Sequence, residues 1–248
     1  MELRQQLLTE NDCYKSGRTL APKGVMVHSL GVAQPDVEVF LRTWNRPDVE
    51  KCVHAFVHRD GVVQTLPWTC RGWHAGVGTS GKSANDTHLS FEICEPAGHT
   101  YEGGTMIGYD PEKNAAYFGA VYQNAVALTA RLCKEFHLDP LADGVVLCHS
   151  EGHTRGIATN HADVMQWFPK HDKTMDDFRA DVKAALTEGD EDEMKLYQYA
   201  SEVPDWAKAS VEKDIQKGVI KLDESGAMGV WESNLQPLVW LDRTGALD

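Results

Sequence analysis

The feature that most constrains this fold is an apolar, β-branched run that ends abruptly in a histidine-rich polar segment. Residues 145–148 contain Val145, Val146 and Leu147, a pattern typical of a buried strand. The polar segment that follows contains His149, His153, Arg155, His161 and Asp163. A buried strand is a rigid support for a reactive group at its end. We therefore interpret His149 and Asp163 as two ligands of one zinc ion.

The third ligand has to come from a distant part of the sequence, and His28 is the candidate. Residues 24–29 are predicted to form a strand in which Met26 and His28 share one face. His28 and His149 each follow an apolar run, so adjacent strands could bring them together. Three protein ligands leave one zinc position open for water, as in catalytic sites. These long spacings alone do not form a motif.

Other residues near this segment offer alternative interpretations. His153, four residues after His149, could be the ligand in its place. Cys148 could be a soft ligand, although strand alternation directs it to the opposite face, into the core. A single buried histidine is more often structural than metal-binding. The choice among these side chains stays open at this point.

Composition restricts the partners and the compartment. The 248 residues allow one large domain, or a medium one with a small one. A formal net charge of −13 argues against nucleic acid and anionic membranes as partners. We find no apolar run of membrane-spanning length, and we expect no signal peptide because no basic segment followed by an apolar one precedes Met26. Six scattered cysteines without a CxxC pair predict reduced thiols and synthesis in the cytoplasm.

Local patterns predict an α/β fold. We expect strands at residues 24–29, 53–58, 62–66, 88–95 and 145–149 and helices at residues 2–8, 35–46, 110–136 and from residue 174, with a glycine-rich loop at residues 98–109. Together they predict a mixed central sheet of five or six strands flanked by helices. The site should then lie in a groove at the strand ends.

A run of acidic residues predicts the domain boundary. Residues 188–194 are interpreted as an acidic linker between a catalytic domain, residues 1–187, and a small, mainly helical unit, residues 195–248. In this small unit we predict a helix over residues 204–217. Its Trp206, Trp231 and Trp240 could stack on sugars, but packing in a small core is the commoner use of tryptophan.

Several short motifs occur together in a characteristic order. They are Val27-His28-Ser29, Trp73-His74-Ala75-Gly76, Ser90-Phe91-Glu92-Ile93, Cys148-His149-Ser150-Glu151-Gly152-His153, Asn160-His161-Ala162-Asp163 and Trp167-Phe168. Over residues 22–186, this ordered set resembles the zinc-dependent N-acetylmuramoyl-L-alanine amidases of the type-two family. These share their fold with peptidoglycan recognition proteins, and the segment around His149 is similar to prophage endolysins of Gram-positive hosts.

The resemblance implies cleavage of the amide between N-acetylmuramic acid and L-alanine of the peptidoglycan stem peptide. By position, His28, His149 and Asp163 match the family's zinc ligands. Glu92 matches the acidic residue that handles the catalytic water. His161 lies where many members carry a lysine that stabilises the oxyanion.

The sequence also departs from the family pattern around the third ligand. The usual Asp-Pro-Gly is Asp163-Val164-Met165 here, and the loop from His149 to Asp163 is longer than in many members. Trp73 and His74 are candidates for substrate binding, although His74 could equally pack its loop. Glu92 could instead be a buried salt-bridge partner, and Glu95 is expected at the surface.

Two other functions remain to be distinguished from the amidase. Proteins of this fold that lack a ligand bind peptidoglycan without cutting it, whereas all three ligand types are present here. A zinc hydrolase of another amide is the second rival. A serine or cysteine hydrolase is disfavoured because the sequence has no nucleophile-elbow pattern.

The small C-terminal unit suggests a partner of its own. It could anchor the protein to the cell wall or mediate homo-oligomerisation. Without a signal peptide, we expect synthesis in the cytoplasm and action on the wall after release, with no membrane insertion and no nucleic-acid partner.

Overall fold

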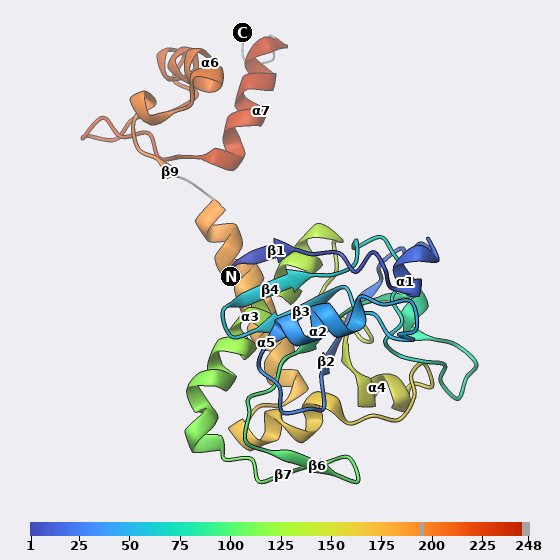
Figure 1. Cartoon of the computed structure of the whole chain (residues 1–248). Helices are drawn as coiled ribbons and strands as arrows, with labels where there is room; N and C mark the ends of the chain where they lie inside the picture. Colours follow the sequence, from blue (N-terminus) through green and yellow to red (C-terminus); the bar gives the residue numbers. More distant parts are fainter. Residues whose placement is uncertain (194–195, 245–248) are drawn as a thin grey trace. The chain divides into compact units, whose positions relative to one another are not determined.

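The computed structural model describes residues 1–193 and 196–244. The chain divides into two compact units, Met1–Leu186 and Thr187–Asp248, which are described separately (Figure 1). Most of the predicted acidic linker is helical, since helix α5 (Met175–Glu193) extends to residue 193. The functions predicted for the two parts of the chain stay predictions.

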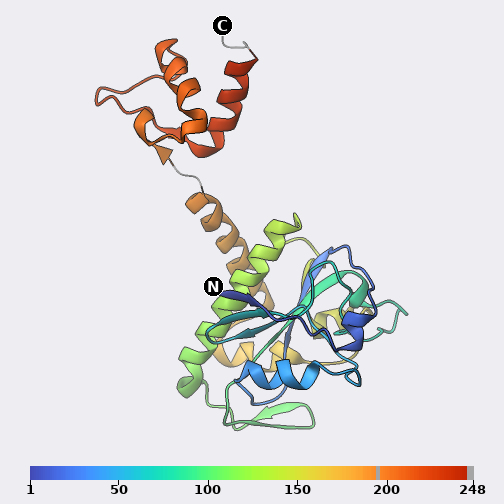
Figure 2. The same cartoon turned by 45° about the horizontal axis from the view of Figure 1, so that its top comes forward.

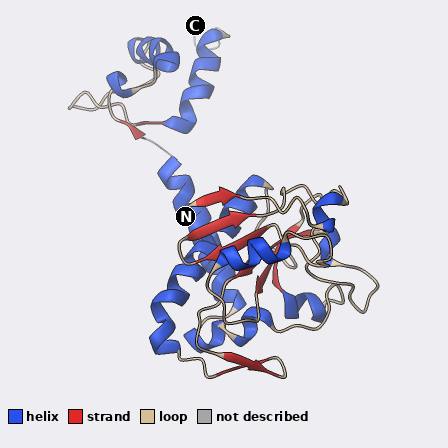
Figure 3. Ribbon diagram, viewed as in Figure 1, coloured by secondary structure: helices blue, strands red, loops and turns tan. Residues whose placement is uncertain are grey.

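A mixed six-stranded sheet forms the centre of the first unit (Figure 3). Its strands, in spatial order, are β1 (Leu3–Gln5), β4 (Gly61–Gln64), β3 (Ala55–His58), β5 (His88–Ile93), β2 (Gly24–Ser29) and β8 (Val146–Cys148). Only the β3–β4 pair is antiparallel. The predicted α/β class, with a mixed sheet flanked by helices, is confirmed.

Parallel pairing of β5, β2 and β8 places their carboxyl ends at one edge of the sheet. In the register of β2, His28 pairs with Glu92 of β5, and Val27 pairs with Cys148 of β8. His149 is the next residue after Cys148, so it lies beside His28. Ligand sites of α/β sheets form at such carboxyl ends.

Helices cover both faces of the sheet (Figures 1 and 2). Helix α2 (Val37–Trp44) packs Phe40 and Trp44 against Phe56 of β3. Helices α3 (Pro111–Glu135) and α5 pack on the larger core, which includes Val25 and Val27. The side chain of Asp110 caps α3 by accepting from the Lys113 amide at 3.1 Å.

Two sequence-based predictions about secondary structure were wrong. Residues 2–8 do not form a helix: Leu3 pairs with Val62 in the edge strand β1, and so short a polar segment carries no periodicity to reveal this. Residues 98–109 are not only loop. They contain the hairpin β6 (Thr100–Glu102) and β7 (Thr105–Ile107), whose turn uses positive φ angles at Gly103 and Gly104.

The segment after β8, which the sequence predicts to be a polar loop, also differs from that prediction. It begins with helix α4 (His149–Thr154), because Glu151 accepts from the Cys148 amide at 3.0 Å and stabilises the helix start. The remaining short helices of the first unit are α1 (Asp12–Lys15), η1 (Ala84–Asp86), η2 (Asp163–Gln166) and η3 (Phe168–His171).

The second unit is mainly helical and has its own core. It contains β9 (Leu196–Tyr197), η4 (Ala200–Glu202), α6 (Asp205–Gln216), β10 (Val230–Trp231) and α7 (Glu232–Arg243). Its core is built around Tyr197, Val211 and Leu235. The three tryptophans expected to fill this core do not: Trp206, Trp231 and Trp240 are 49%, 41% and 65% exposed.

Throughout the part of the chain that the structure describes, each helix is too short or too polar to cross a bilayer.

Candidate functional site

Three of the predicted ligand atoms converge at the carboxyl edge of the sheet. The Nδ1 atom of His28 lies 2.7 Å from Oδ2 of Asp163 and 3.1 Å from Nδ1 of His149. The third side of this triangle, from His149 Nδ1 to Asp163 Oδ2, is 3.2 Å. Tetrahedral zinc, with bonds of about 2.0–2.1 Å, holds its ligands about 3.3 Å apart. The triangle is therefore close to the size that zinc requires, and we call these three side chains the metal triad.

Each member of the metal triad comes from a different element. His28 lies on β2, His149 begins α4, and Asp163 begins η2. Asp163 adopts a left-handed backbone with φ +46°. Such a conformation is uncommon and costly for a residue other than glycine, and it turns the long loop from His149 back to the sheet edge.

The two alternative ligands lie outside the triad. The ring of His153 faces the backbone carbonyl of Ala158, 3.3 Å from its Nδ1 atom. Cys148 is buried in the larger core, as strand alternation predicted. Among the described residues, the metal triad is the one group of three or more histidine, cysteine or acidic side chains with metal-binding geometry.

Protonation in the metal triad suits metal binding. Burial raises the pKa of Asp163, but hydrogen bonds from His149 and His28 outweigh burial, and its pKa lies below the ordinary value. Burial also lowers the pKa of His28, against the opposing effect of Asp163. A carboxylate and neutral imidazoles are the forms that bind metal ions.

A chain of hydrogen bonds fixes the orientation of the His28 ring. Its Nε2 atom lies 3.0 Å from Nδ1 of His74, whose own Nε2 lies 3.3 Å from the backbone carbonyl of His88. Because that carbonyl can only accept, His74 donates from Nε2 and accepts at Nδ1. His28 then donates from Nε2, which leaves the lone pair of its Nδ1 directed at the centre of the triad.

A second chain orients the His149 ring in the same way. Its Nε2 atom lies 3.2 Å from the Thr159 hydroxyl, which donates to the Ala75 carbonyl at 3.3 Å. The Thr159 amide donates to the same carbonyl at 2.9 Å. His149 therefore donates from Nε2 and presents the lone pair of Nδ1 to the triad.

Both chains pass through residues 73–76, which a single buried amide holds in place. The Oδ1 atom of Asn85 accepts from the His74 amide at 2.8 Å and from the Ala75 amide at 2.9 Å. Asn85 and Thr159 were not found by sequence reasoning, because an amide and a hydroxyl in irregular segments carry no periodic signal. Both ring nitrogens of His74 have protein partners. Its substrate contact stays a prediction.

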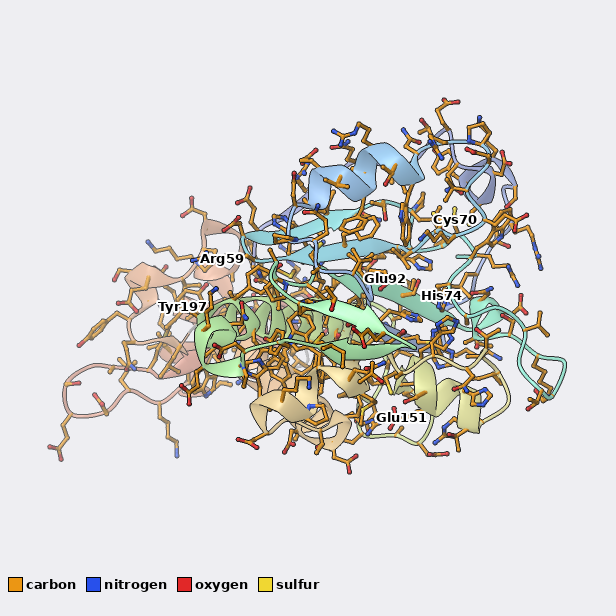
Figure 4. All side chains as sticks on the ribbon, turned by 60° about the horizontal axis from the view of Figure 1, so that its bottom comes forward. Arg59, Cys70, His74, Glu92, Glu151 and Tyr197 are labelled. Carbon is orange, nitrogen blue, oxygen red and sulfur yellow. The ribbon has the colours of Figure 1, made fainter. Side chains whose placement is uncertain are left out.

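Glu92 is a half-buried residue beside the metal triad, since it pairs with His28 across strands β5 and β2. Its side chain is labelled in Figure 4, together with that of His74. Its Oε2 atom has no hydrogen-bond partner among the described residues. Burial raises its pKa well above the ordinary range; Asp163 adds to the effect and Lys51 opposes it. The alternative role of buried salt-bridge partner finds no support, since no basic group of the described chain lies within 4.0 Å of Glu92. An orphaned buried carboxylate is costly and points to a functional role.

The metal triad opens into a cavity of about 920 Å³. Its lining includes Glu92 and His74, together with His161 and Trp73. The exposed ring of His161 lies 4.7 Å from the His149 ring, centroid to centroid. Trp73 is half-buried, and its backbone pairs with Cys52 through two hydrogen bonds of 2.9 Å. The structure therefore brings all the predicted site residues to one cavity, and the roles of these residues stay predictions.

Glu95 was expected at the surface, and that prediction was wrong. It is 0% exposed and accepts three hydrogen bonds of 2.9 Å, from the Gly31 amide, His99 Nε2 and the Tyr101 hydroxyl. Tyr101 belongs to β6 and lines the cavity. The hairpin folds over the end of β5, a tertiary contact that the local sequence does not signal, and Glu95 fixes this cavity wall.

Comparison with solved structures shows that the fold is shared with amidase and endolysin catalytic domains. The catalytic domain of XlyA has a TM-score of 0.55 at 21% identity and covers 73% of this chain and 99% of that one. PlyL has a TM-score of 0.55 at 20% identity, with coverages of 75% and 99%. Staphylococcus aureus AmiA, solved with its ligand, has a TM-score of 0.54 at 19% identity, with coverages of 77% and 86%.

Sequence comparison identifies the family. The chain is 27% identical over 105 residues to the N-acetylmuramoyl-L-alanine amidase CwlH of Bacillus subtilis (strain 168), which is 42% of each protein. The chain thus spans less than half the length of this curated relative. The family model described as N-acetylmuramoyl-L-alanine amidase matches residues 18–166, more than half of the chain. This protein therefore belongs to the N-acetylmuramoyl-L-alanine amidase family (Amidase_2).

Proposed function

We propose that the unit Met1–Leu186 is a zinc-dependent peptidoglycan amidase. It hydrolyses the amide between the lactyl group of N-acetylmuramic acid and L-alanine of the stem peptide. The observation that carries this proposal is the convergence of two imidazole nitrogens and a carboxylate oxygen beside the orphaned carboxyl of Glu92. Family membership supports the choice of substrate.

His28, His149 and Asp163 would hold the zinc ion, and the size of the triangle and the donor types fit it. When bound, zinc polarises a carbonyl group and makes water more acidic. His74 and Thr159 keep the two imidazoles in the tautomer that presents Nδ1. This orientation is built into the protein before any substrate arrives.

Glu92 acts as general base and then as general acid. Its Oε2 atom, free of hydrogen bonds in the described chain, accepts a proton from the attacking water. Burial raises the pKa of Glu92, which makes the carboxylate a stronger base than one in solvent. The same proton then passes from Glu92 to the nitrogen of L-alanine, so that the amine can leave.

His161 and Trp73 act on the substrate from the cavity walls. His161 lies at the exposed side of His149 and donates a hydrogen bond to the carbonyl oxygen as negative charge develops there. The half-buried indole of Trp73 provides an apolar surface for the substrate. The ring of His74, which also lines the cavity, contacts the substrate as well.

Mass spectrometry of digested peptidoglycan tests the proposal, because the new chain ends identify the bond. We expect a free lactyl carboxyl group on muramic acid and a free amino group on L-alanine. New ends at another amide would identify the protein as a zinc hydrolase of different specificity. Binding to peptidoglycan without any new ends would identify a recognition module.

The C-terminal unit is proposed to be a binding module. Three exposed tryptophans on a unit of this size favour a binding surface, either for the cell wall or for a second copy of the chain. Replacing Trp240 by alanine in the full chain should reduce sedimentation with purified cell walls if the unit anchors the enzyme. It should instead lower the mass measured by light scattering if the unit self-associates. A change in neither property would contradict both roles.

A further inference from the structure

Lys51 enters the cavity from a rigid segment of backbone. Its carbonyl oxygen accepts a hydrogen bond of 3.1 Å from the buried Asn11 amide group. The next residue, Cys52, forms the two backbone hydrogen bonds with Trp73. The exposed Lys51 side chain therefore extends from a fixed point of the backbone, and Trp44 and Val53 line the same cavity.

The ammonium group of Lys51 has an aromatic support and no acidic partner. Its Nζ atom lies 4.5 Å from the centroid of the Trp44 ring, and this indole is 5% exposed. Among the described residues, no carboxylate lies within 4.0 Å of it, and that includes Glu50 of the same cavity. A cation held on an indole face keeps its free N–H groups available to a ligand.

The other lysine or arginine that lines the cavity, Arg71, already has an acidic partner, Asp86, which Arg18 shares. Arg71 lies with its Nε atom 2.5 Å from Oδ1 of Asp86. The acidic residues that line the cavity are Glu50, Glu92 and Asp163. Among the described residues, Lys51 is the lysine or arginine of the cavity lining without a carboxylate partner, so its ammonium group can receive an anionic group of a substrate. Lys51 and Glu92 line the same cavity, so the ammonium group shares this space with the site of chemistry.

We propose that Lys51 forms a carboxylate-binding subsite, so that the enzyme prefers stem peptides with a free carboxylate close to the scissile amide. This inference rests on the proposed amidase function. The residue that follows L-alanine in a stem peptide is D-glutamate linked through its γ-carboxyl group, and its α-carboxyl group is either free or amidated. A carboxylate can pair with the ammonium of Lys51, whereas a neutral carboxamide makes the weaker hydrogen bond.

The test compares two soluble muropeptides that differ only in a carboxylate or a carboxamide at the second stem residue. For the unmodified enzyme we expect kcat/KM to be roughly tenfold higher for the carboxylate, the size of one charge-assisted hydrogen bond. Lys51→Met should reduce the preference to within about twofold, through a higher KM for the carboxylate, and Lys51→Arg should retain most of it. Lys23→Met, at an exposed position outside the cavity, is the matched control.

A second pair of substrates, amidated or free at the side-chain carboxyl of the third residue, shows which carboxylate is bound. Equal rates for both members of both pairs would overturn the inference while leaving the amidase function intact. A preference that survives in a folded Lys51→Met enzyme would also overturn it. Failure to cleave any of the four substrates would instead contradict the proposed function on which the inference depends.

Discussion

His28 and Glu92 occupy paired positions on the neighbouring parallel strands β2 and β5. Paired residues of adjacent strands point to the same face and lie about 5 Å apart at their Cα atoms. The proposed metal ligand and the proposed general base are thus separated by one step across a hydrogen-bonded sheet. Their spacing depends on backbone hydrogen bonds within the sheet and not on loops.

Replacing Glu92 by glutamine should separate metal binding from catalysis. The amide is nearly isosteric but cannot accept the proton, so turnover should fall by about 10²- to 10⁴-fold. The zinc content should stay at that of the unmodified protein, because Glu92 is not in the metal triad. Release of new amino groups from cell walls and elemental analysis measure the two properties. Normal turnover in this variant would remove Glu92 from the mechanism.

Removing a member of the metal triad should abolish metal binding. Asp163→Asn loses the charged ligand, and a chelator should have the same effect on the unmodified protein. Because metal binds the folded chain, zinc should raise the melting temperature of the unmodified protein but not that of the variant. Calorimetric scans with and without zinc measure this. A zinc-dependent rise in the Asp163→Asn variant would place the metal elsewhere.

The hydrogen bonds behind the two imidazoles should set the affinity for zinc. His74→Phe removes the acceptor for His28, and Thr159→Val removes the partner of His149. Each should weaken zinc binding by about 10- to 100-fold. Competition with a chromophoric chelator measures the affinity, and Thr43→Val on the exposed face of α2 is the control. If His74 served only the substrate, His74→Phe would raise KM and leave zinc affinity unchanged.

Gly76 should be required for the close approach of residues 73–76 to Thr159. A Cβ atom there would lie 2.6 Å from Thr159 Cγ2, and the backbone is left-handed with φ +63°. Gly17 has φ +62° and open space around it, so Gly17→Ala carries the same backbone strain without the contact. Both variants should be destabilised by about 1 kcal/mol, and Gly76→Ala should also lose zinc affinity. Equal zinc affinities would show that the contact is unimportant.

Acid should destabilise the first unit through His54. Its Nε2 atom donates to the Cys70 carbonyl at 2.8 Å, and its Nδ1 accepts from the Ser90 amide at 3.0 Å. Burial lowers the pKa of His54 to about 4. As the pH falls from 6.5 towards 4, the unfolded chain binds a proton that the folded chain excludes, so up to about 3 kcal/mol of stability is lost.

The variant His54→Gln isolates this effect from that of other titrating groups. It should be less stable than the unmodified protein at pH 7, and the difference should shrink as the pH falls to 5. Urea unfolding, monitored through hydrogen exchange in peptides from β3 and β5, measures the free energy of unfolding of the first unit alone. Parallel losses of stability in the two proteins would show that His54 is not the titrating group.

Strand periodicity was sufficient to predict one part of the site. Alternation along residues 24–29 and the apolar run before His149 placed His28 and His149 at the ends of two buried strands. In a parallel sheet such ends meet at one edge, and the structure has β2 and β8 paired. The same logic directed Cys148 into the core. The order in which the short motifs follow one another along the chain indicated the family.

Other parts of the site depend on contacts that have no local signal. Asn85 and Thr159 act through hydrogen bonds to residues 10 to 84 positions away, and no periodic pattern marks them. Glu95 looked like the exposed end of a strand until the hairpin β6–β7 covered it. The tryptophans of the second unit were ambiguous for a similar reason, since a tryptophan can pack in a core or form part of a binding surface.

By itself, the sequence determined strands β2, β3, β4, β5 and β8, the helices α2, α3 and α5 and the two histidines at the strand ends, because side-chain alternation follows directly from backbone geometry. Only the tertiary structure decided how Asp163 returns to those histidines and which groups hold their rings. It also decided that Lys51, among the described residues that line the cavity, rests on an indole and has no acidic partner. These properties depend on distances between segments far apart in the chain, and such distances are set by packing of the whole unit.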